Sequence, residues 1–390
     1  MKYLIALCSI LIFLSPVGAA PIYGALQSTT EHIKELHDVG LQLATIEVYW
    51  DRYEPKEGQF NAGFIQETKR KMTALRKAGM QLVLDFGMQY PPAWVYELTG
   101  GKYQNQYGDL FAPPGAGMNG VNAVFSKAVR ERQTRYARRV LSDLGTDFYA
   151  VRLGWGHYGE LNYPLHKFNG HNNCYWGFDP IAQHGGPNLP AGIKPCPVPG
   201  WKPGEPSVDH QNATRFINWY LDSLKNYHDW QISTIRALYP GRLAMLYPSW
   251  GLRPGGIEGE VMMDLDGSTS PAINGEIQRG FDFARFIGGV KHPKLIVYCT
   301  WLDANGEDNG TNKQAWSPIH YLASLAQANT HHLAVWGENT GGNDYTSMQR
   351  CFEQMKRWKL IGMMWAFEGE LFDGSHATLK QYKELIMQDF

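Results

Sequence analysis

The chain has 390 residues, a formal net charge of −1 and 44% hydrophobic residues. A chain this long and this apolar can bury a large core, and no basic run stands out that could hold a nucleic acid through its phosphates. It also contains 13 Trp and 21 Tyr, an aromatic content that predicts a large aromatic core, a surface for stacking ligands, or both.

The first 19 residues have the layout of a secretory signal. Lys2 supplies a short charged region, an apolar run extends to Leu14, and Val17-Gly18-Ala19 offers small residues for cleavage. The apolar run is too short to span a bilayer comfortably. We therefore expect a secreted or periplasmic mature chain that starts near Ala20 and has no membrane contact after cleavage.

Eight short apolar runs recur along the chain, and each precedes a stretch with helical character. Runs rich in Val, Ile, Leu and aromatic residues predict strands that are buried on both faces. In chain order the predicted strands are Ile22–Gln27, Leu43–Trp50, Gln81–Gly87, Phe148–Trp155, Arg242–Trp250, Lys294–Trp301, His332–Asn339 and Ile361–Glu368. The helices expected after them are Thr29–Val39, Ala62–Ala78, Asn122–Leu144, Ala213–Leu238, Gly275–Val290, Ser317–Ala328, Tyr345–Trp358 and Ala377–Asp389.

Eight alternations of strand and helix favour an α/β fold of the (β/α)8 TIM-barrel type. We expect residues 20–390 to form this barrel as a single domain. The alternative is a doubly wound open sheet, but the sequence has no Gly-rich phosphate loop to support it.

The longest stretch without a helix or strand pattern is the insertion 156–211, after the fourth strand. Long loops in compact domains are usually functional, so this one is predicted to wall one side of the active-site mouth. The alternative is a surface flap without substrate contact. Cys174 and Cys196 both lie in the insertion and could form a disulfide, as exported proteins often do. No CxxC or HExxH spacing occurs, so we expect no structural metal.

Polar and aromatic residues gather where the predicted strands end, which is where barrel enzymes carry their chemistry. Five of the eight strands deliver a Trp at or near this end. A ring of indoles around carboxylates would suit a sugar, because flat apolar faces bind C–H surfaces and charge acts at the scissile bond. The candidate substrate-binding residues are Trp50, Tyr90, Trp94, Trp155, His157, Asn162, Trp250, Trp301, Asp303, Trp336, Asn339, Trp365 and Glu368.

Cleavage of a glycosidic bond needs two carboxyl groups, held about 5–5.5 Å apart in retaining enzymes and about 6.5–9.5 Å apart in inverting ones. Glu160 follows the fourth strand in an aromatic turn, where partial burial would raise its pKa and suit a proton donor. Glu338 ends the seventh strand, across the barrel mouth. Either glutamate could instead be a buried carboxylate paired with an arginine such as Arg152.

The layout resembles the clan of retaining barrel glycosidases that includes the family 42 β-galactosidases. The segment from Trp50 to Phe60, WDRYEPKEGQF, and the later YPPAWV from Tyr90 are similar to motifs of that family. The resemblance implies Glu160 as acid/base and Glu338 as nucleophile. The clan usually has Asn just before the acid/base, where it binds the sugar 2-hydroxyl, whereas this chain has Gly159.

A second resemblance is to the β-amylases. The segment Gly159-Glu160-Leu161-Asn162-Tyr163-Pro164 resembles the motif that carries their general acid, and Gly337-Glu338-Asn339 resembles another segment of that family. Their base lies in a Cys-Leu-Glu-Met motif, and here the corresponding stretch places Asp303 nearest. This resemblance implies Glu160 as acid and Asp303 as base.

Three hypotheses therefore remain. The first is a retaining glycoside hydrolase acting on a β-galactoside-like substrate, with Glu160 and Glu338 as the catalytic pair. The second is an inverting, β-amylase-like glycosidase with Glu160 and Asp303. The third is a carbohydrate-binding barrel without catalysis. All three expect an oligo- or polysaccharide partner and no cofactor, and none predicts the oligomeric state.

Overall fold

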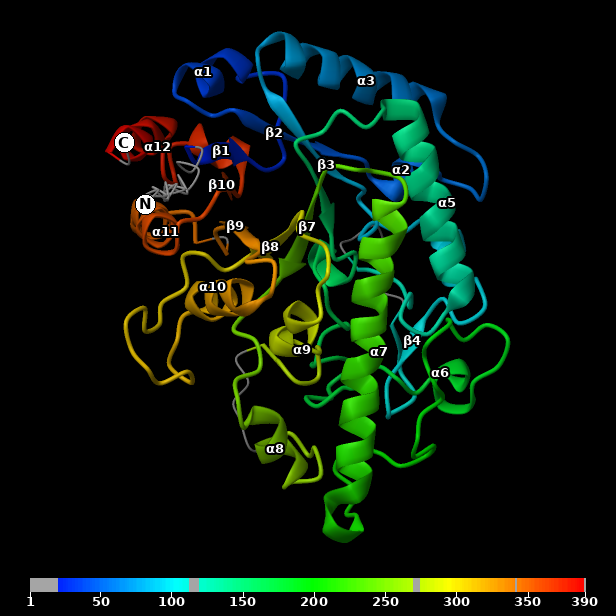
Figure 1. Cartoon of the computed structure of the whole chain (residues 1–390). Helices are drawn as coiled ribbons and strands as arrows, with labels where there is room; N and C mark the ends of the chain where they lie inside the picture. Colours follow the sequence, from blue (N-terminus) through cyan, green and yellow to red (C-terminus); the bar gives the residue numbers. More distant parts are fainter. Residues whose placement is uncertain (1–19, 112–118, 269–273, 341, 389–390) are drawn as a thin grey trace, which may run out of the picture.

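The computed structural model describes residues 20–111, 119–268, 274–340 and 342–388. The predicted signal, residues 1–19, lies outside them. Eight parallel strands close into a barrel in the order β1-β10-β9-β8-β7-β6-β3-β2, as Figure 1 shows. They are β1 (Ile22–Ala25), β2 (Leu43–Glu47), β3 (Gln81–Asp85), β6 (Ala150–Leu153), β7 (Arg242–Tyr247), β8 (Leu295–Cys299), β9 (Ala334–Glu338) and β10 (Gly362–Trp365). The predicted (β/α)8 barrel is confirmed, and each predicted strand overlaps one of these.

Helices surround the barrel, with α3, α5 and α7 on one side and α10, α11 and α12 on the other (Figure 1). The helices that match the predicted ones are α1 (Ile33–Asp38), α3 (Ala62–Lys77), α5 (Lys127–Leu144), α7 (Gln211–Arg236), α9 (Phe283–Gly288), α10 (Pro318–Ala328), α11 (Tyr345–Trp358) and α12 (Leu379–Gln388). Side-chain caps explain several starts: Asn61, Ser126, Ser317 and Asp344 each accept a hydrogen bond from the first turn of the helix that follows.

Short elements that the sequence analysis missed decorate the loops. They are the helices α2 (Trp50–Tyr53), α4 (Ala93–Tyr96), α6 (Pro180–His184) and α8 (Gly256–Val261), the 3₁₀ turns η1 (His157–Gly159), η2 (Val208–His210) and η3 (Glu368–Leu371), and the hairpin of β4 (Tyr103–Gln104) and β5 (Leu110–Phe111). Each spans six residues or fewer, which is too short for a hydrophobic period to emerge.

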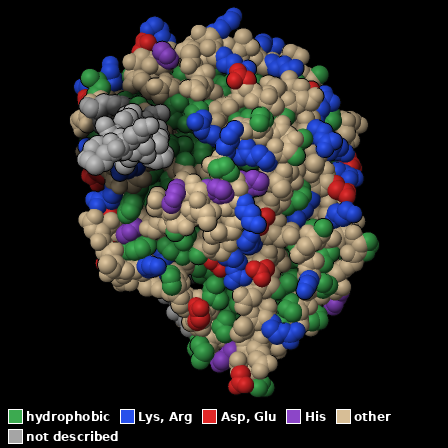
Figure 2. Space-filling model, in the orientation of Figure 1, with side chains coloured by type: hydrophobic (Ala, Val, Ile, Leu, Met, Phe, Trp, Pro, Cys, Tyr) green, Lys and Arg blue, Asp and Glu red, His purple; other side chains and the backbone are tan. Residues whose placement is uncertain are grey.

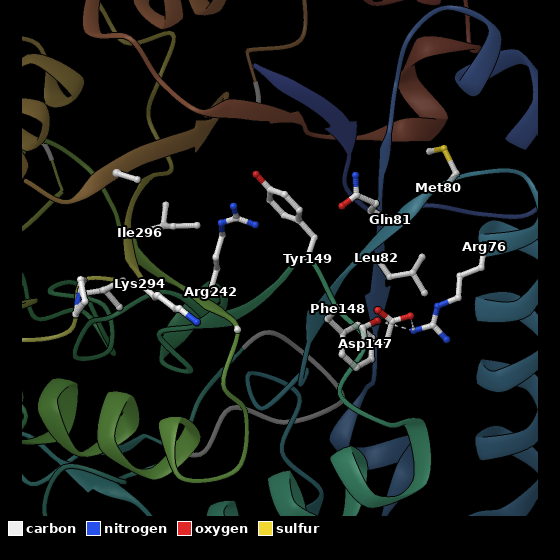
Figure 3. A pocket seen from close by; sticks show the side chains of 14 residues that line it. Arg76, Met80, Gln81, Leu82, Asp147, Phe148, Tyr149, Arg242, Lys294 and Ile296 are labelled. Carbon is white, nitrogen blue, oxygen red and sulfur yellow. Dashed lines mark hydrogen bonds and ion pairs between the residues drawn. The ribbon is translucent and has the colours of Figure 1, made fainter. Parts of the chain in front are cut away.

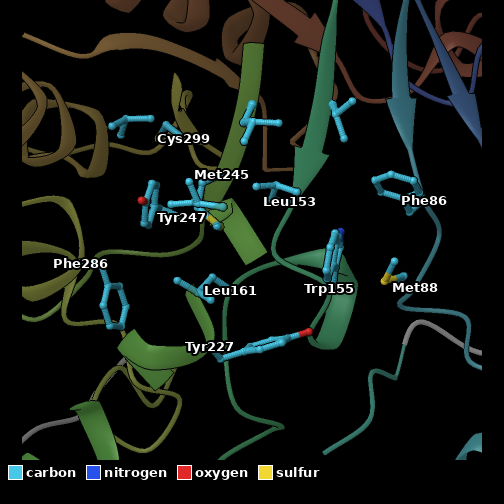
Figure 4. Close-up of a cluster of buried hydrophobic side chains, with 14 of the residues drawn as sticks. Phe86, Met88, Leu153, Trp155, Leu161, Tyr227, Met245, Tyr247, Phe286 and Cys299 are labelled. Atoms are coloured by element: carbon cyan, nitrogen blue, oxygen red, sulfur yellow. The ribbon is translucent and has the colours of Figure 1, made fainter. Parts of the chain in front are cut away.

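Side chains of the barrel strands alternate between two separate apolar cores. The core inside the barrel contains Leu43, Val83, Ile296 and Trp336. The larger core lies between the sheet and the helices, and Figure 4 shows part of it, where Leu153, Met245 and Cys299 point away from the barrel interior. The alternation decides which strand-end residues can face the mouth of the barrel.

The insertion 156–211 is more ordered than predicted, since it contains η1, α6 and η2. Cys174 and Cys196 are free, buried thiols, so the predicted disulfide is not formed. Non-covalent contacts with the β4–β5 hairpin hold the insertion instead. The Tyr175 backbone N–H donates to the Gln106 side chain at 2.8 Å, and the Trp176 ring packs edge-on against Phe111, with centroids 5.3 Å apart.

A pocket of about 550 Å³ opens at the N-terminal ends of the strands, opposite the expected chemistry. Figure 3 shows Arg242, Tyr149 and Gln81 around it, and Lys and Arg side chains are prominent on the face drawn in Figure 2. In barrel enzymes this end contributes to stability, whereas catalysis occurs at the other end. Of the helices in the described ranges, none combines the length and apolar character that a membrane crossing requires.

Candidate active site

Glu160 lies directly after η1, in the loop that continues β6 at the C-terminal end of the barrel. Its Oε1 accepts a hydrogen bond from the Thr300 hydroxyl at 2.8 Å, and its Oε2 accepts one from the Asn162 amide at 3.3 Å. Burial raises the pKa of Glu160 to about 7, against the opposing charge of Arg279 and the Thr300 hydrogen bond, and the Glu338 charge raises it further. A carboxylic acid that keeps its proton near neutral pH can act as a general acid.

Glu338 ends β9, points into the barrel mouth and is 9% exposed. Its Oε2 accepts hydrogen bonds from Arg152 Nη1 at 2.9 Å and from the Tyr298 hydroxyl at 2.7 Å. Its Oε1 has only a 3.5 Å contact with Arg152 Nη2. The carboxylate is therefore oriented through one oxygen, while the other is weakly engaged. The predicted alternative, a pairing with Arg152, is real, and it is compatible with a nucleophile because it fixes the geometry of the group.

A layer of charged side chains supports this pair inside the barrel. Glu47, Asp85 and Arg152 stand in register on the neighbouring strands β2, β3 and β6, and Arg152 Nε lies 3.5 Å from Asp85. Burial raises the pKa of Glu47, and the Asp85 charge adds to this effect. Glu47 also accepts a hydrogen bond from the Tyr49 hydroxyl at 2.9 Å. The barrel mouth thus contains two further carboxyl groups, those of Glu47 and Asp85, in addition to the two candidate catalytic ones.

Gly159 is the point at which the sequence departs from the retaining clan, and Gln89 fills the space beside it. Gly159 has a φ of +79°, and a methyl group added there would lie 3.1 Å from the Gln89 side-chain amide. Gln89 is 6% exposed, and its Oε1 has no hydrogen-bond partner. A buried amide oxygen without a partner is costly, so Gln89 is a candidate ligand for a substrate hydroxyl that the sequence analysis did not select.

Asp303 is bonded to the loop that follows β9. Its carboxylate accepts hydrogen bonds from the Thr340 backbone N–H at 2.7 Å and from the Thr340 hydroxyl at 3.3 Å. Burial raises the pKa of Asp303, while these bonds and Ser347 of α11 lower it. The Asp303 side chain is thus occupied by the loop after β9, whereas the residue of the β8 segment that bonds Glu160 is Thr300.

The predicted ring of indoles is wrong for four of its tryptophans. Trp50 is fully buried, stacks on Tyr136 with centroids 5.1 Å apart and donates to Glu54. Trp155 is 2% exposed and lies in the outer core, edge-on to Phe86 with centroids 5.8 Å apart (Figure 4). Trp336 faces the barrel interior but sits one layer below Glu338, edge-on to Tyr298. Buried rings that already fill a core cannot stack on a sugar.

Trp365 is the fourth. It is 0% exposed and belongs to the outer core, where its ring meets Tyr382 of α12 with centroids 6.4 Å apart. The inward-facing residues at the end of β10 are Met364 and Ala366, and Phe367 packs against their cluster. Phe367, half-buried, is therefore the aromatic side chain that this strand brings toward the barrel interior.

Trp365→Ala should consequently lower stability and leave substrate affinity unchanged in the molecules that remain folded. Removing a buried Trp costs about 3–5 kcal/mol. The measurements are a urea unfolding curve and KM at a temperature at which the variant is folded. The opposite pattern, a stable variant with a raised KM, would return Trp365 to the substrate site.

Of the other candidate residues, some contact the catalytic groups and some only hold neighbouring segments of the protein together. Asn162 contacts Glu160, and it also donates to the His157 backbone carbonyl at 3.0 Å, which fixes the turn that carries the acid. Asn339 exchanges hydrogen bonds with the backbone of Ala366 at 2.9 and 2.8 Å and so ties β9 to β10. Glu368 accepts from the backbone and hydroxyl of Thr29 at 3.0 and 2.6 Å.

Four aromatic candidates remain partly exposed. Tyr90 meets Tyr49 edge-on, with centroids 4.8 Å apart, near Glu47. Trp94 donates to the Glu54 backbone carbonyl at 3.1 Å, which gives it a scaffold role as well. Trp250 and Trp301 follow β7 and β8 and are partly accessible. These four are the predicted aromatic residues whose rings the fold leaves available.

Within the described ranges, no group of three or more His, Cys, Asp or Glu side chains could hold a metal ion. The residues that sequence reasoning missed are Thr300, Tyr298, Arg279 and Gln89. Tyr298 could have been selected as a site residue from the sequence, because its hydroxyl is a polar group within the otherwise apolar strand β8. The contacts of Thr300, Arg279 and Gln89 with this site depend on how loops pack, which spacing does not reveal.

Comparisons with known proteins bear on the fold. No protein-family model and no curated protein sequence matches this chain. Among solved structures, the catalytic domain of the Paenibacillus polymyxa β-amylase aligns with a TM-score of 0.67 at 13% identity, over 95% of this chain and 99% of that one. The chain shares its fold with β-amylases and β-galactosidases.

Two β-galactosidases illustrate the second group. The enzyme from Halorubrum lacusprofundi aligns with a TM-score of 0.56 at 14% identity, over 94% of this chain. The enzyme from Marinomonas aligns with a TM-score of 0.59 at 10% identity, also over 94% of this chain. This chain spans only 58% and 59% of those longer proteins. At such identities the likeness establishes a common barrel, and function must be argued from the site.

Proposed function

We propose that this protein is a glycoside hydrolase that cleaves a β-glycoside with retention of anomeric configuration. The observation that carries the proposal is the presence of two carboxyl groups in unlike environments at the C-terminal end of the barrel, with the charge of one acting on the pKa of the other. The pKa of Glu160 is raised to about 7 by burial, whereas Glu338 is ion-paired to Arg152 at 2.9 Å. Two carboxyl groups whose environments differ in this way divide into a proton donor and an anion.

The proposed reaction has two steps. In the first, a Glu338 oxygen attacks the anomeric carbon while Glu160 gives its proton to the departing glycosidic oxygen, which leaves a glycosyl ester on Glu338 and a carboxylate on Glu160. In the second, Glu160 takes a proton from a water molecule as the water oxygen attacks the anomeric carbon, and the bond between that carbon and Glu338 breaks, which releases the sugar and restores the Glu338 carboxylate. Oε1 of Glu338 suits the attack, since Arg152 and Tyr298 mainly hold Oε2.

The inverting alternative is less well supported, because Asp303 is bonded to Thr340 on the loop after β9. The product distinguishes the two mechanisms. Proton NMR of the sugar released in the first minutes from an aryl β-glycoside should show the β-anomer, and a first-formed α-anomer would reject retention. The aryl β-galactoside is the first substrate to try, alongside glucoside, xyloside and fucoside, and absence of hydrolysis across the panel would favour a binding protein.

Gln89→Ala should weaken catalysis if the Gln89 amide binds a substrate hydroxyl in the place of the missing asparagine at position 159. A lost hydrogen bond to a substrate hydroxyl predicts a decrease in kcat/KM of about tenfold or more. A 2-deoxy glycoside, which lacks the hydroxyl that the missing asparagine would bind, tests this directly, since wild type and Gln89→Ala should have the same kcat/KM on it. A variant equally impaired on both substrates would show that Gln89 has only a packing role.

We also propose that the protein is exported and that the mature chain begins near Ala20. Support comes from the charged, apolar and small-residue regions of residues 1–19. Expression of the full chain in a bacterial host, followed by N-terminal sequencing of the periplasmic or medium fraction, should return a sequence that starts close to Ala20-Pro21-Ile22. Recovery of only the uncleaved chain from the cytoplasm or membrane would contradict export.

A further inference from the structure

Arg279 is a buried cation beside the site that the proposed reaction does not use. The side chain is 1% exposed, its Nε and Nη2 have no hydrogen-bond partner, and it forms no ion pair with the described residues. Two other buried arginines are held by more protein oxygens. Arg130 donates to three of them, and Arg253, whose Nε also lacks a partner, donates through Nη1 and Nη2 to the backbone carbonyls of Trp250, Gly251 and Trp316.

Backbone contacts place Arg279 next to the segment that carries Glu160. The Tyr163 N–H donates to the Arg279 carbonyl at 3.0 Å, and the Arg279 N–H donates to the Gly275 carbonyl at 2.8 Å. The Phe281 ring lies beneath the guanidinium, 5.0 Å from centroid to Cζ. The backbone of Arg279 is thereby held in its turn and its guanidinium lies against an aromatic face, while no acceptor among the described residues bonds its Nε or Nη2.

The arrangement is expensive unless an anion binds. A buried charge without a direct partner destabilises the folded state. Burial lowers the pKa of Arg279, and the charges of Glu160 and Glu276 oppose this effect without forming an ion pair with the guanidinium. A guanidinium presents its N–H groups as a planar fork that matches the two oxygens of a carboxylate. Glu160 protonates the leaving oxygen in the proposed reaction, so a group bound beside it belongs to the leaving-group side of the substrate.

We propose that Arg279 binds the carboxylate of a uronic acid on the leaving-group side, which makes the natural substrate an acidic oligosaccharide. This inference rests on the proposed function and specifies its substrate class. The competing possibility is that Arg279 acts only on the charge of Glu160. That role would shift the pH dependence of catalysis without any preference for acidic sugars, so the two can be separated.

The test is the binding of glucuronate and galacturonate against glucose and galactose, measured by ligand-observed NMR or calorimetry on the folded wild-type protein. We expect the uronates to bind about tenfold more tightly or better, as a charge-assisted carboxylate contact predicts. Arg279→Gln should abolish this preference, and Arg279→Lys should keep part of it because the charge remains. Arg285→Gln is the matched control, since Arg285 pairs with Asp222 and Asp282, and it should retain the full preference.

Equal binding of uronates and neutral sugars by wild type would overturn the inference, even if the variants failed to fold. So would a preference that survives in Arg279→Gln. The proposed function fails separately. Hydrolysis of neutral aryl glycosides that depends on Glu160 and Glu338, without a uronate preference, rejects only the role of Arg279. A uronate preference that depends on Arg279, in a protein that hydrolyses no glycoside, rejects only the catalytic proposal.

Discussion

Glu338→Gln is expected to lower kcat by about 10⁴-fold or more, because removing a nucleophile eliminates the covalent route and not merely one contact. The amide has nearly the same shape, but it cannot form the glycosyl ester. It also removes the charge that pairs with Arg152, which then keeps the 3.5 Å ion pair with Asp85 and a 3.2 Å hydrogen bond to the Tyr298 hydroxyl, so some loss of stability is expected as well. The measurements are kcat on an activated aryl glycoside and a thermal melt of the same preparation.

Two further variants keep this prediction sharp. Asp303→Asn should retain most of the wild-type activity, since Asp303 is bonded to Thr340. Glu338→Gly should recover turnover when azide is supplied, because the small anion can attack the anomeric carbon in place of the carboxylate. If Asp303→Asn were inactive and Glu338→Gln active, Asp303 and not Glu338 would be the partner of Glu160, and the inverting mechanism would be supported.

Glu160→Gln should produce the second large effect, and its size should depend on the leaving group. A poor leaving group needs the proton that Glu160 supplies, so kcat/KM for a natural glycoside should decrease by about 10²–10⁴-fold. For a dinitrophenyl glycoside, which departs without protonation, the first step should be nearly unaffected. Equal losses on both substrates would argue against an acid role. Asn162→Ala, which removes one hydrogen bond to Glu160, should have a smaller effect in the same direction.

The pH profile follows from the charges around Glu160. Burial and the Glu338 charge raise its pKa to about 7, while Arg279, Thr300 and Arg152 oppose them. The acid is thus protonated below pH 7 and loses its proton above it, so kcat/KM on natural substrates should decrease above about pH 7. The residual activity of Glu160→Gln on the same substrates should lack this alkaline decrease. A wild-type profile that stays flat to pH 9 would contradict the assignment.

The same shift has a consequence for stability. Because the pKa of Glu160 in the folded protein lies above that of an unfolded glutamate, the folded state binds a proton more tightly. The stability contribution of this proton is complete below the unfolded pKa and declines as the pH rises toward 7. Glu160→Gln removes the cost of ionising a buried carboxyl, so the variant should gain in Tm relative to wild type at pH 8 but not at pH 5. An equal difference at both pH values would contradict a raised pKa.

The sequence by itself determined the barrel and the positions of its strands. Eight apolar runs with helices between them leave few ways to bury every strand on both faces. The same reading placed Glu160 and Glu338 at the ends of two strands, which β7 and β8 separate in the barrel, because strand ends are visible as changes from apolar to polar residues. The short loop helices α2, α4, α6 and α8 escaped it, as did the contacts of Thr300, Arg279 and Gln89, because neither leaves a period in the sequence.

Only the tertiary structure decided which strand-end side chains face the mouth. Successive residues of a strand point to opposite faces, so a difference of one position moves a side chain from the mouth to the helix-facing core. Glu338 and Trp336 share the inward face, with the tryptophan one layer deeper, whereas Trp365 points outward to α12. Counting tryptophans near strand ends ignored this alternation and overestimated the aromatic lining. The charged residues Arg152 and Glu338 could have set the inward face of their own strands, but β10 (Gly362–Trp365) contains no such marker, and its orientation follows from closure of the barrel.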